Sequence, residues 1–346
     1  MAGKRMLRIF GVVLGVWGGL ASSVAQAGPA LLFDAANGRI LYAEDLDNQW
    51  HPASLTKIMT AYVVFEAIKE GKISLETRIR CSELAHVQPP SKIGLNVGAE
   101  MSVQKGLEAL IIKSANDVAV MLAEAVAGSQ EAFVERMNGV AQRLGMTRTK
   151  FVNANGLPEP EQVTTARDLA RLASAVFKDF PEYAHMWAMT ETRVGKAQLR
   201  THNGLLNNYA GADGMKTGFI CDSGYNVVAS ATRDGHKLVA VVLGEVTGND
   251  RALRAASLLE HGFMTYNWKL AFPGQTIATM PLEPDAKGPI TIRESVISWV
   301  CGKSQKAMAK MRKRRAEKIA ETNAYKKVVP RAKSAKAAAP AEGSKE

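Results

Sequence analysis

The sequence is poor in cysteine and histidine, which limits the kinds of site that it can build. Its three cysteines, Cys81, Cys221 and Cys301, show no Cys-x-x-Cys spacing, which argues against a zinc knuckle or a dense disulfide framework. One bridge is compatible with this count, but we interpret all three as small packed residues, with Cys221 on a strand. None of the six histidines belongs to a His-Glu-x-x-His motif, so neither a metal nor another cofactor is expected.

Long apolar runs are also lacking, with one exception at the start of the chain. There the positive charges of Lys4, Arg5 and Arg8 precede an apolar run, and Ala25-Gln26-Ala27 has the small-x-small form of a cleavage site. This pattern predicts a signal peptide, residues 1–27, and export across the inner membrane to the periplasm or cell envelope. A membrane span is disfavoured because the run is shorter than the ~20 residues that a bilayer requires.

Positive charge is concentrated at the other end of the chain. Residues 303–346 contain 14 Lys and Arg against 4 Glu, so they carry +10 of the formal net charge of +11. Without the signal peptide's +3, residues 28–302 carry −2. We expect residues 302–346 to form a disordered basic tail, because large apolar side chains are few there. Electrostatic contact of this tail with anionic membrane or wall polymers is favoured over a free tail, and export argues against nucleic acid as a partner.

Strand patterns occur at both ends of the central region and helical patterns lie between them. Asn37-Gly38 between two apolar runs is a strong hairpin signal. Apolar periodicity of three and four residues then predicts a mostly helical region at about 54–200. Together these patterns predict an α+β fold, with one five-stranded antiparallel sheet and an inserted helical subdomain. The expected strands are 30–33, 40–43, 215–221, 225–232 and 238–243.

A helix predicted at 251–263 would cover one face of this sheet. The following residues, 264–301, contain four prolines and only short apolar runs, so they are expected to form a short extension. Within it, residues 290–297 are the best candidate for another strand.

Ser54-Leu55-Thr56-Lys57 is the first candidate for chemistry. It follows Pro52, where a helix can begin, and residues three apart share one helix face. Lys57 is thus expected to reach the hydroxyl of Ser54 and remove its proton, which makes Ser54 a candidate nucleophile. Burial and a second ammonium nearby would lower the pKa of Lys57 enough for this role.

Two further motifs raise the significance of Ser54 and Lys57. Ser114-Ala115-Asn116 begins a predicted helix, and Lys216-Thr217-Gly218 lies on the first late strand. Ser114 is expected to relay protons to the leaving amine, and Asn116 to hold Lys57 and bind the substrate's peptide group. Lys216 and Thr217 suit a carboxylate, while Gly218 permits close approach of a ligand.

An oxyanion site is also expected. It would consist of the backbone N–H groups of Ser54 and Phe219, as preorganised donors for a tetrahedral intermediate.

These three motifs, in this order, resemble those of the serine D-alanyl-D-alanine carboxypeptidases, the low-molecular-mass penicillin-binding proteins of peptidase family S11. The resemblance implies a β-lactamase/DD-peptidase-like fold and removal of the terminal D-alanine from peptidoglycan pentapeptide stems through an acyl-enzyme on Ser54. It also implies acylation by β-lactams and an arginine near the substrate carboxylate, for which Arg251 is the candidate. The resemblance extends over the segments 31–34, 51–60, 88–92, 155–158, 165–168 and 213–230.

The resemblance assigns residues 28–263 to a catalytic domain. Many relatives continue into a second β-rich domain, and here residues 264–301 leave that domain absent or truncated.

Other functions remain open from the residues alone. A DD-endopeptidase acting on cross-links would use the same catalytic groups. A β-lactamase would need an added general base, and no motif marks Glu159 or Glu161 as one. A non-catalytic penicillin-binding wall protein would not require the proton-handling groups, and its function would survive Ser54→Ala.

Overall fold

The computed structural model describes residues 28–296 and residue 301. The predicted signal peptide, 1–27, and the predicted basic tail, 302–346, lie outside the described residues. None of the described helices combines the length and apolar character needed to cross a bilayer.

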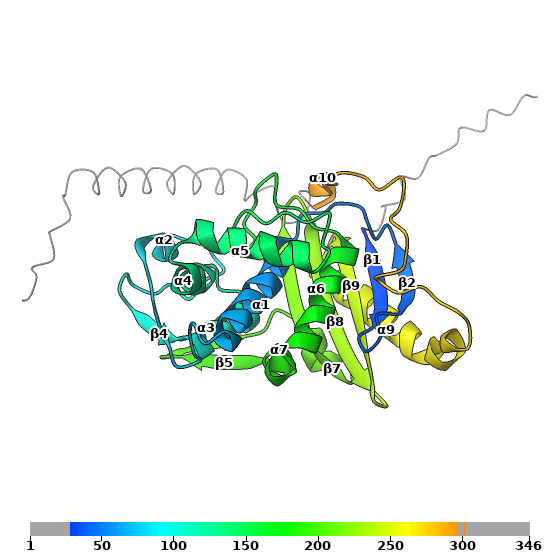
Figure 1. Cartoon of the computed structure of the whole chain (residues 1–346), viewed down its shortest axis with the longest axis horizontal. Helices are drawn as coiled ribbons and strands as arrows, with labels where there is room; N and C mark the ends of the chain where they lie inside the picture. Colours follow the sequence, from blue (N-terminus) through cyan, green and yellow to red (C-terminus); the bar gives the residue numbers. More distant parts are fainter. Residues whose placement is uncertain (1–27, 297–300, 302–346) are drawn as a thin grey trace, which may run out of the picture.

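A five-stranded antiparallel sheet with the order β2-β1-β9-β8-β7 forms the centre of the fold (Figure 1). The predicted α+β class, with an antiparallel sheet built from both ends of the chain, is therefore confirmed. The edge strands are β2 and β7, so the Lys216-Thr217-Gly218 motif lies on an edge. The strands are β1 (Ala30–Asp34), β2 (Ile40–Glu44), β7 (Ala212–Ile220), β8 (Gly224–Arg233) and β9 (His236–Glu245).

Side chains alternate between the two faces of this sheet, as the period of two residues in a strand requires. On β1, Leu31 and Phe33 belong to the core shared with the helical region, whereas Leu32 packs on the other face with Leu258 and Leu259. Both faces are thus covered, one by the helical region and the other by helix α9 (Gly248–Leu270) (Figure 1).

The helical region lies between β2 and β7 in the chain. Its helices are α1 (Thr56–Lys69), α2 (Glu83–His86), α3 (Val103–Glu108), α4 (Asn116–Ala127), α5 (Gln130–Arg143), α6 (Ala166–Asp179), α7 (Ala184–Ala188) and α8 (Leu205–Asn208), with single turns η1 (Ala53–Leu55), η2 (Ala109–Lys113, a π-helix) and η3 (Pro181–Tyr183). Two small two-stranded antiparallel sheets that periodicity did not predict are also present: β3 (Arg78–Arg80) with β4 (Glu100–Ser102), and β5 (Glu191–Val194) with β6 (Ala197–Arg200).

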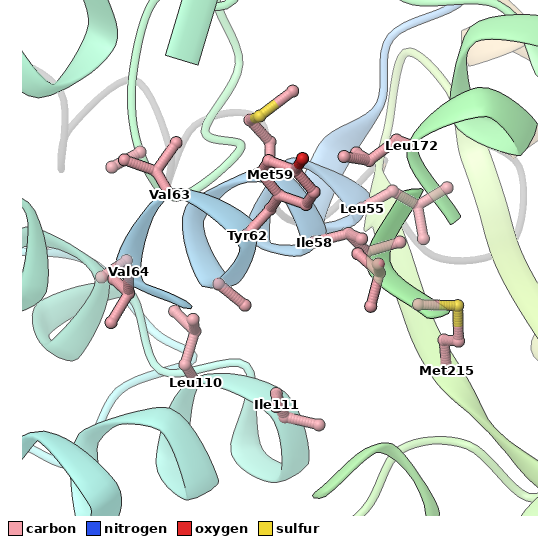
Figure 2. Packing of buried hydrophobic residues seen from close by; sticks show 14 of the residues in the cluster. Leu55, Ile58, Met59, Tyr62, Val63, Val64, Leu110, Ile111, Leu172 and Met215 are labelled. Carbon is pink, nitrogen blue, oxygen red and sulfur yellow. The ribbon is translucent and has the colours of Figure 1, made fainter. Parts of the chain in front are cut away.

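Helix α1 is buried on nearly all sides, because almost every residue from Thr56 to Ala67 is apolar or small. Figure 2 shows Leu110 and Leu172 on either side of the helix, with Met215 of β7 also nearby. Close packing of this kind fixes the position of α1 relative to β7. The N-terminal end of α1 is therefore held in a defined place beside the sheet.

The chain beyond α9 departs from expectation in two places. A strand was predicted at 290–297, but its described residues, 290–296, do not form one. Thr291 and Ile292 are irregular, and a short helix, α10 (Arg293–Val296), follows. The favoured interpretation of all three cysteines as small packed residues is also wrong for two of them, because Cys221 and Cys301 form the one bridge that the cysteine count allowed. Cys81 is a free, buried cysteine, as expected.

Candidate active site

Ser54 lies in the single turn η1, directly before α1. The Nζ atom of Lys57, one turn later, is 3.0 Å from the Oγ atom of Ser54. The spacing of three residues thus places the two groups side by side, as the sequence predicted.

The amine of Lys57 is fully buried and has two further partners. It donates a hydrogen bond of 2.8 Å to Oδ1 of Asn116 and another to the backbone carbonyl of Asn155. Burial lowers the pKa of Lys57 well below its ordinary value, and the positive charge of Lys216 lowers it further, against an opposing effect of Asp117. The lowered pKa favours the neutral form of the Lys57 amine.

Ser114 and Asn116 are presented by the junction between η2 and α4. Ser114 has a positive φ of 60° where the π-helix ends. The side-chain amide of Asn116 donates a hydrogen bond of 2.9 Å to the carbonyl of Pro89. Within the described chain, the Oγ atom of Ser114 is buried and has no hydrogen-bond partner. Ser114 lines the cleft described below, and its hydroxyl has no partner in the described chain that would compete with an incoming group.

Lys216, Thr217 and Gly218 are consecutive residues of the edge strand β7. Lys216 is buried and donates to the carbonyl of Thr217 at 3.1 Å. Burial lowers the pKa of Lys216 to about 7, and the charge of Arg251 contributes in the same direction. Two adjacent buried lysines, Lys57 and Lys216, thus share one site in which neither can be charged without cost.

Two glycines allow the backbone segments around Ser54 to approach closely. A Cβ atom on Gly218 would lie 3.0 Å from the carbonyl oxygen of Pro52 and 3.1 Å from the backbone nitrogen of Ser54. On the other side, a Cβ atom on Gly156 would lie 1.9 Å from the carbonyl oxygen of Ala53. Gly156 also has a positive φ of 81°, which favours glycine.

A cleft of about 1030 Å³ contains these groups. Ser54, Ser114, Asn116 and the run from Thr217 to Asp222 all contribute to its lining. Lys57 and Lys216 lie behind it, within hydrogen-bond or charge contact of the lining residues.

Arg251, at the start of α9, also lines the cleft. Its guanidinium donates to the carbonyl of His202 at 3.4 Å and lies 5.8 Å from the centre of the Tyr225 ring. Burial lowers its pKa to about 10, partly opposed by Tyr225. Arg251 is thus a second cationic side chain at the Lys216 end of the site, where the two together suit the binding of an anion.

The sequence reasoning missed one contributor to the site. Asn155 accepts a hydrogen bond from Lys57 through its backbone, and its side-chain amide donates 2.9 Å to Gln88. Asn155-Gly156 is a turn dipeptide, which signals a tight loop but not that its carbonyl reaches a lysine about 100 residues away.

Comparisons with known proteins show which family this chain resembles. The family model described as D-alanyl-D-alanine carboxypeptidase, of the S11 peptidases, matches residues 20–247. Among curated proteins, the chain is 38% identical over 263 residues to the D-alanyl-D-alanine carboxypeptidase DacC of Escherichia coli, covering 74% of this chain and 63% of that protein. It is 36% identical over 241 residues to DacA of Haemophilus influenzae, covering 68% of this chain and 61% of the relative. The match thus spans less than two thirds of the length of either relative.

Solved structures give the same result. Penicillin-binding protein 5 of Haemophilus influenzae is similar with a TM-score of 0.67 and 37% identity, over 69% of this chain and 71% of that one. Penicillin-binding protein D2 of Listeria monocytogenes, solved in its cefotaxime-bound form, has a TM-score of 0.63 and 32% identity, over 68% of this chain and 97% of that one.

Proposed function

The chain belongs to the S11 family of D-alanyl-D-alanine carboxypeptidases, and we propose that it removes the terminal D-alanine from peptidoglycan stem peptides through an acyl-enzyme on Ser54. The observation that carries this proposal is the 3.0 Å approach of the buried Lys57 amine, with its lowered pKa, to the Ser54 hydroxyl.

Acylation begins with proton transfer from Ser54. A neutral amine has two N–H groups and one lone pair; the carbonyl oxygens of Asn116 and Asn155 accept the two N–H groups, so the lone pair faces Ser54. The Ser54 oxygen attacks the carbonyl carbon of the penultimate D-alanine while Lys57 takes its proton. The backbone N–H groups of Ser54 and Phe219 stabilise the oxyanion that forms.

Collapse of this tetrahedral intermediate breaks the peptide bond. The proton held by Lys57 passes through the hydroxyl of Ser114 to the leaving nitrogen, and free D-alanine departs. Water then attacks the ester, Lys57 removes a proton from it, and Ser54 regains its hydrogen as the shortened stem is released.

Recognition of the substrate's terminal carboxylate falls to the cationic end of the site. Lys216 and Arg251 supply positive charge, and Thr217 supplies a hydroxyl donor. Gly218 keeps the strand edge clear for the ligand. A β-lactam presents a similar amide and carboxylate, so we propose that it acylates Ser54 and that water releases it slowly.

The decisive experiment compares wild type, Ser54→Ala and Ser257→Ala, which alters an exposed serine of α9. Fluorescent penicillin labelling and release of D-alanine from a diacetylated Lys-D-Ala-D-Ala peptide should both disappear in Ser54→Ala alone. Labelling of Ser54→Ala at the wild-type level would reject the nucleophile. Rapid release of the bound penicillin by wild type would instead indicate a β-lactamase.

We propose the periplasm or cell envelope as the place of action. The predicted signal peptide and the wall-located substrate support this location. Contact of the basic tail with anionic membrane or wall polymers belongs to the same proposal. Its test is cosedimentation with anionic vesicles, where equal pelleting with and without the tail would reject attachment.

A further inference from the structure

The chain that follows α9 returns across the body of the protein to the cleft. Backbone hydrogen bonds mark its course: Ile277 donates to Gly38, Ile290 to Gln49, and Ile292 to Asp222 at 3.1 Å. Arg167, buried in an ion pair with Asp47, also donates to the carbonyl of Met280 at 2.7 Å. The described part of the extension is thus bonded to the folded body along its length.

Its last residues are fixed at the rim of the cleft, beside the turn that follows β7. Arg293 forms an ion pair of 2.7 Å with Asp222, and the hydroxyl of Thr291 donates 3.0 Å to the carbonyl of Asp222. A Cβ atom on Gly224 would lie 2.4 Å from Cδ1 of Ile292, so this isoleucine packs directly on the β7–β8 turn. The Cys221–Cys301 disulfide joins the same turn to the end of the described chain.

Residues 289–293 form a rim segment, of which Pro289, Thr291 and Arg293 line the same cleft as Ser54. The ion pair with Asp222 orients the guanidinium of Arg293, yet the side chain of Arg293 remains 40% exposed. One ion pair leaves further N–H donors of the guanidinium for a ligand, and their fork geometry matches a carboxylate.

The orientation of a bound stem peptide follows from the edge strand. With its terminal carboxylate at Lys216 and Thr217 and its scissile carbonyl at Ser54, beside Gly218, the upstream residues must continue toward Cys221 and away from Lys216. From Gly218 to Cys221 the chain advances roughly 10 Å, about the length of three extended residues. The upstream part of the stem therefore reaches the rim segment.

We infer that the rim segment, held by the Cys221–Cys301 disulfide, is a substrate-recognition wall in which Arg293 binds a carboxylate upstream of the scissile bond. This inference rests on the proposed function and adds to it a substrate class: stems with a free carboxylate about two residues before the penultimate D-alanine. The contact with Arg293 should then affect mainly the KM of the substrate, because Arg293 is remote from the reacting atoms.

The test uses two peptides that share the D-Ala-D-Ala end. One is diacetylated Lys-D-Ala-D-Ala, which has no upstream carboxylate, and the other is L-Ala-γ-D-Glu-L-Lys-D-Ala-D-Ala, whose glutamate has one. Arg293→Gln should raise KM for the pentapeptide about fivefold relative to its KM for the short peptide, as loss of a half-exposed ion pair predicts. The matched control is Arg136→Gln. It removes another partly exposed arginine, on α5, which forms an ion pair of 3.2 Å with Glu70.

Cys301→Ser provides a second variant that leaves Arg293 in place. It should raise the same KM ratio, whereas Cys81→Ser, which alters the free buried cysteine, should leave the ratio unchanged. Penicillin labelling of each variant verifies that its site has folded. Equal changes for both peptides, or no change in Arg293→Gln, would overturn the inference. Failure of wild type to cleave either peptide would instead reject the proposed function itself.

Discussion

Lys57 of α1 donates a hydrogen bond of 2.8 Å to the side chain of Asn116, the first residue of α4. Because the acceptor is an uncharged amide, it fixes the position of the amine without favouring the ammonium form as a carboxylate would. This contact therefore orients the proposed base, while burial and the charge of Lys216 keep its pKa low.

Asn116→Asp should raise the pKa of Lys57. A carboxylate this close raises the pKa of an amine by about one to three units, so the rising limb of kcat/KM against pH should move to higher pH by that amount. Asn207→Asp adds the same charge at an exposed position of α8 and should leave the limb where it is. A pH profile of Asn116→Asp that overlies that of wild type would show that Lys57 is not the titrating base.

Ser114→Ala tests the proton relay. The Oγ atom of Ser114 has no hydrogen-bond partner among the described residues, so its removal should alter the free energy of unfolding little. The rate of penicillin acylation should nevertheless fall about 100-fold, as loss of a proton-transfer group predicts. Ser174→Ala removes another buried hydroxyl that lacks a partner in the described chain, and its acylation rate should remain at the wild-type level. Equal rates in Ser114→Ala and wild type would exclude the relay.

Gly156→Ala should displace the backbone of Ser54. Its new Cβ atom would lie 1.9 Å from the carbonyl oxygen of Ala53, and a misplacement of about 1 Å lowers catalysis roughly 100-fold. The matched control is Gly235→Ala, where φ is also positive, at 78°, and nothing lies within 4 Å. Both variants should lose thermal stability through backbone strain, and only Gly156→Ala should lose penicillin acylation. Normal acylation by Gly156→Ala would show that this close contact does not position Ser54.

Lys216→Met should stabilise the protein near neutral pH. The pKa of Lys216 is about 7 in the folded protein against 10.5 for an ordinary lysine, so the unfolded chain binds more protons between these values. In this window the free energy of unfolding of wild type rises with pH, and Lys216 destabilises the fold most at the lower end. The Tm of Lys216→Met should thus exceed the Tm of wild type most near pH 7, and the difference should shrink toward pH 10.5.

Thermal unfolding at several pH values measures this difference. Lys178→Met, which removes an exposed lysine of α6, is the control and should show no such trend. A difference in Tm that does not depend on pH would contradict the expected burial of charge at Lys216.

The local sequence predicts those parts of the fold that depend on periodicity and turn chemistry. The strand pair around Asn37-Gly38 and the three late strands follow short, largely apolar runs and their turns, and the contact between Ser54 and Lys57 follows helical spacing. The two-stranded sheets β3–β4 and β5–β6 escaped prediction because strands of three or four residues are too short to show a period.

Contacts between distant segments required the structure. Cysteine spacing says nothing about partners that are 80 residues apart, so the Cys221–Cys301 bridge was not foreseen. Residues 290–297 have strand-like composition, yet Thr291 and Ile292 bond to the backbone of Asp222 instead of a neighbouring strand. The carbonyl of Asn155 is a backbone group, whose direction no residue type reveals.

The bridge between Cys221 and Cys301 closes a covalent ring that contains β8, β9 and α9. A protease that cuts once at an exposed point of this ring would leave both pieces joined. Such a nicked molecule would migrate as one band on a denaturing gel without reductant and as two bands after a thiol is added. Damage within this part of the chain would therefore escape detection wherever samples are examined only in their oxidised form.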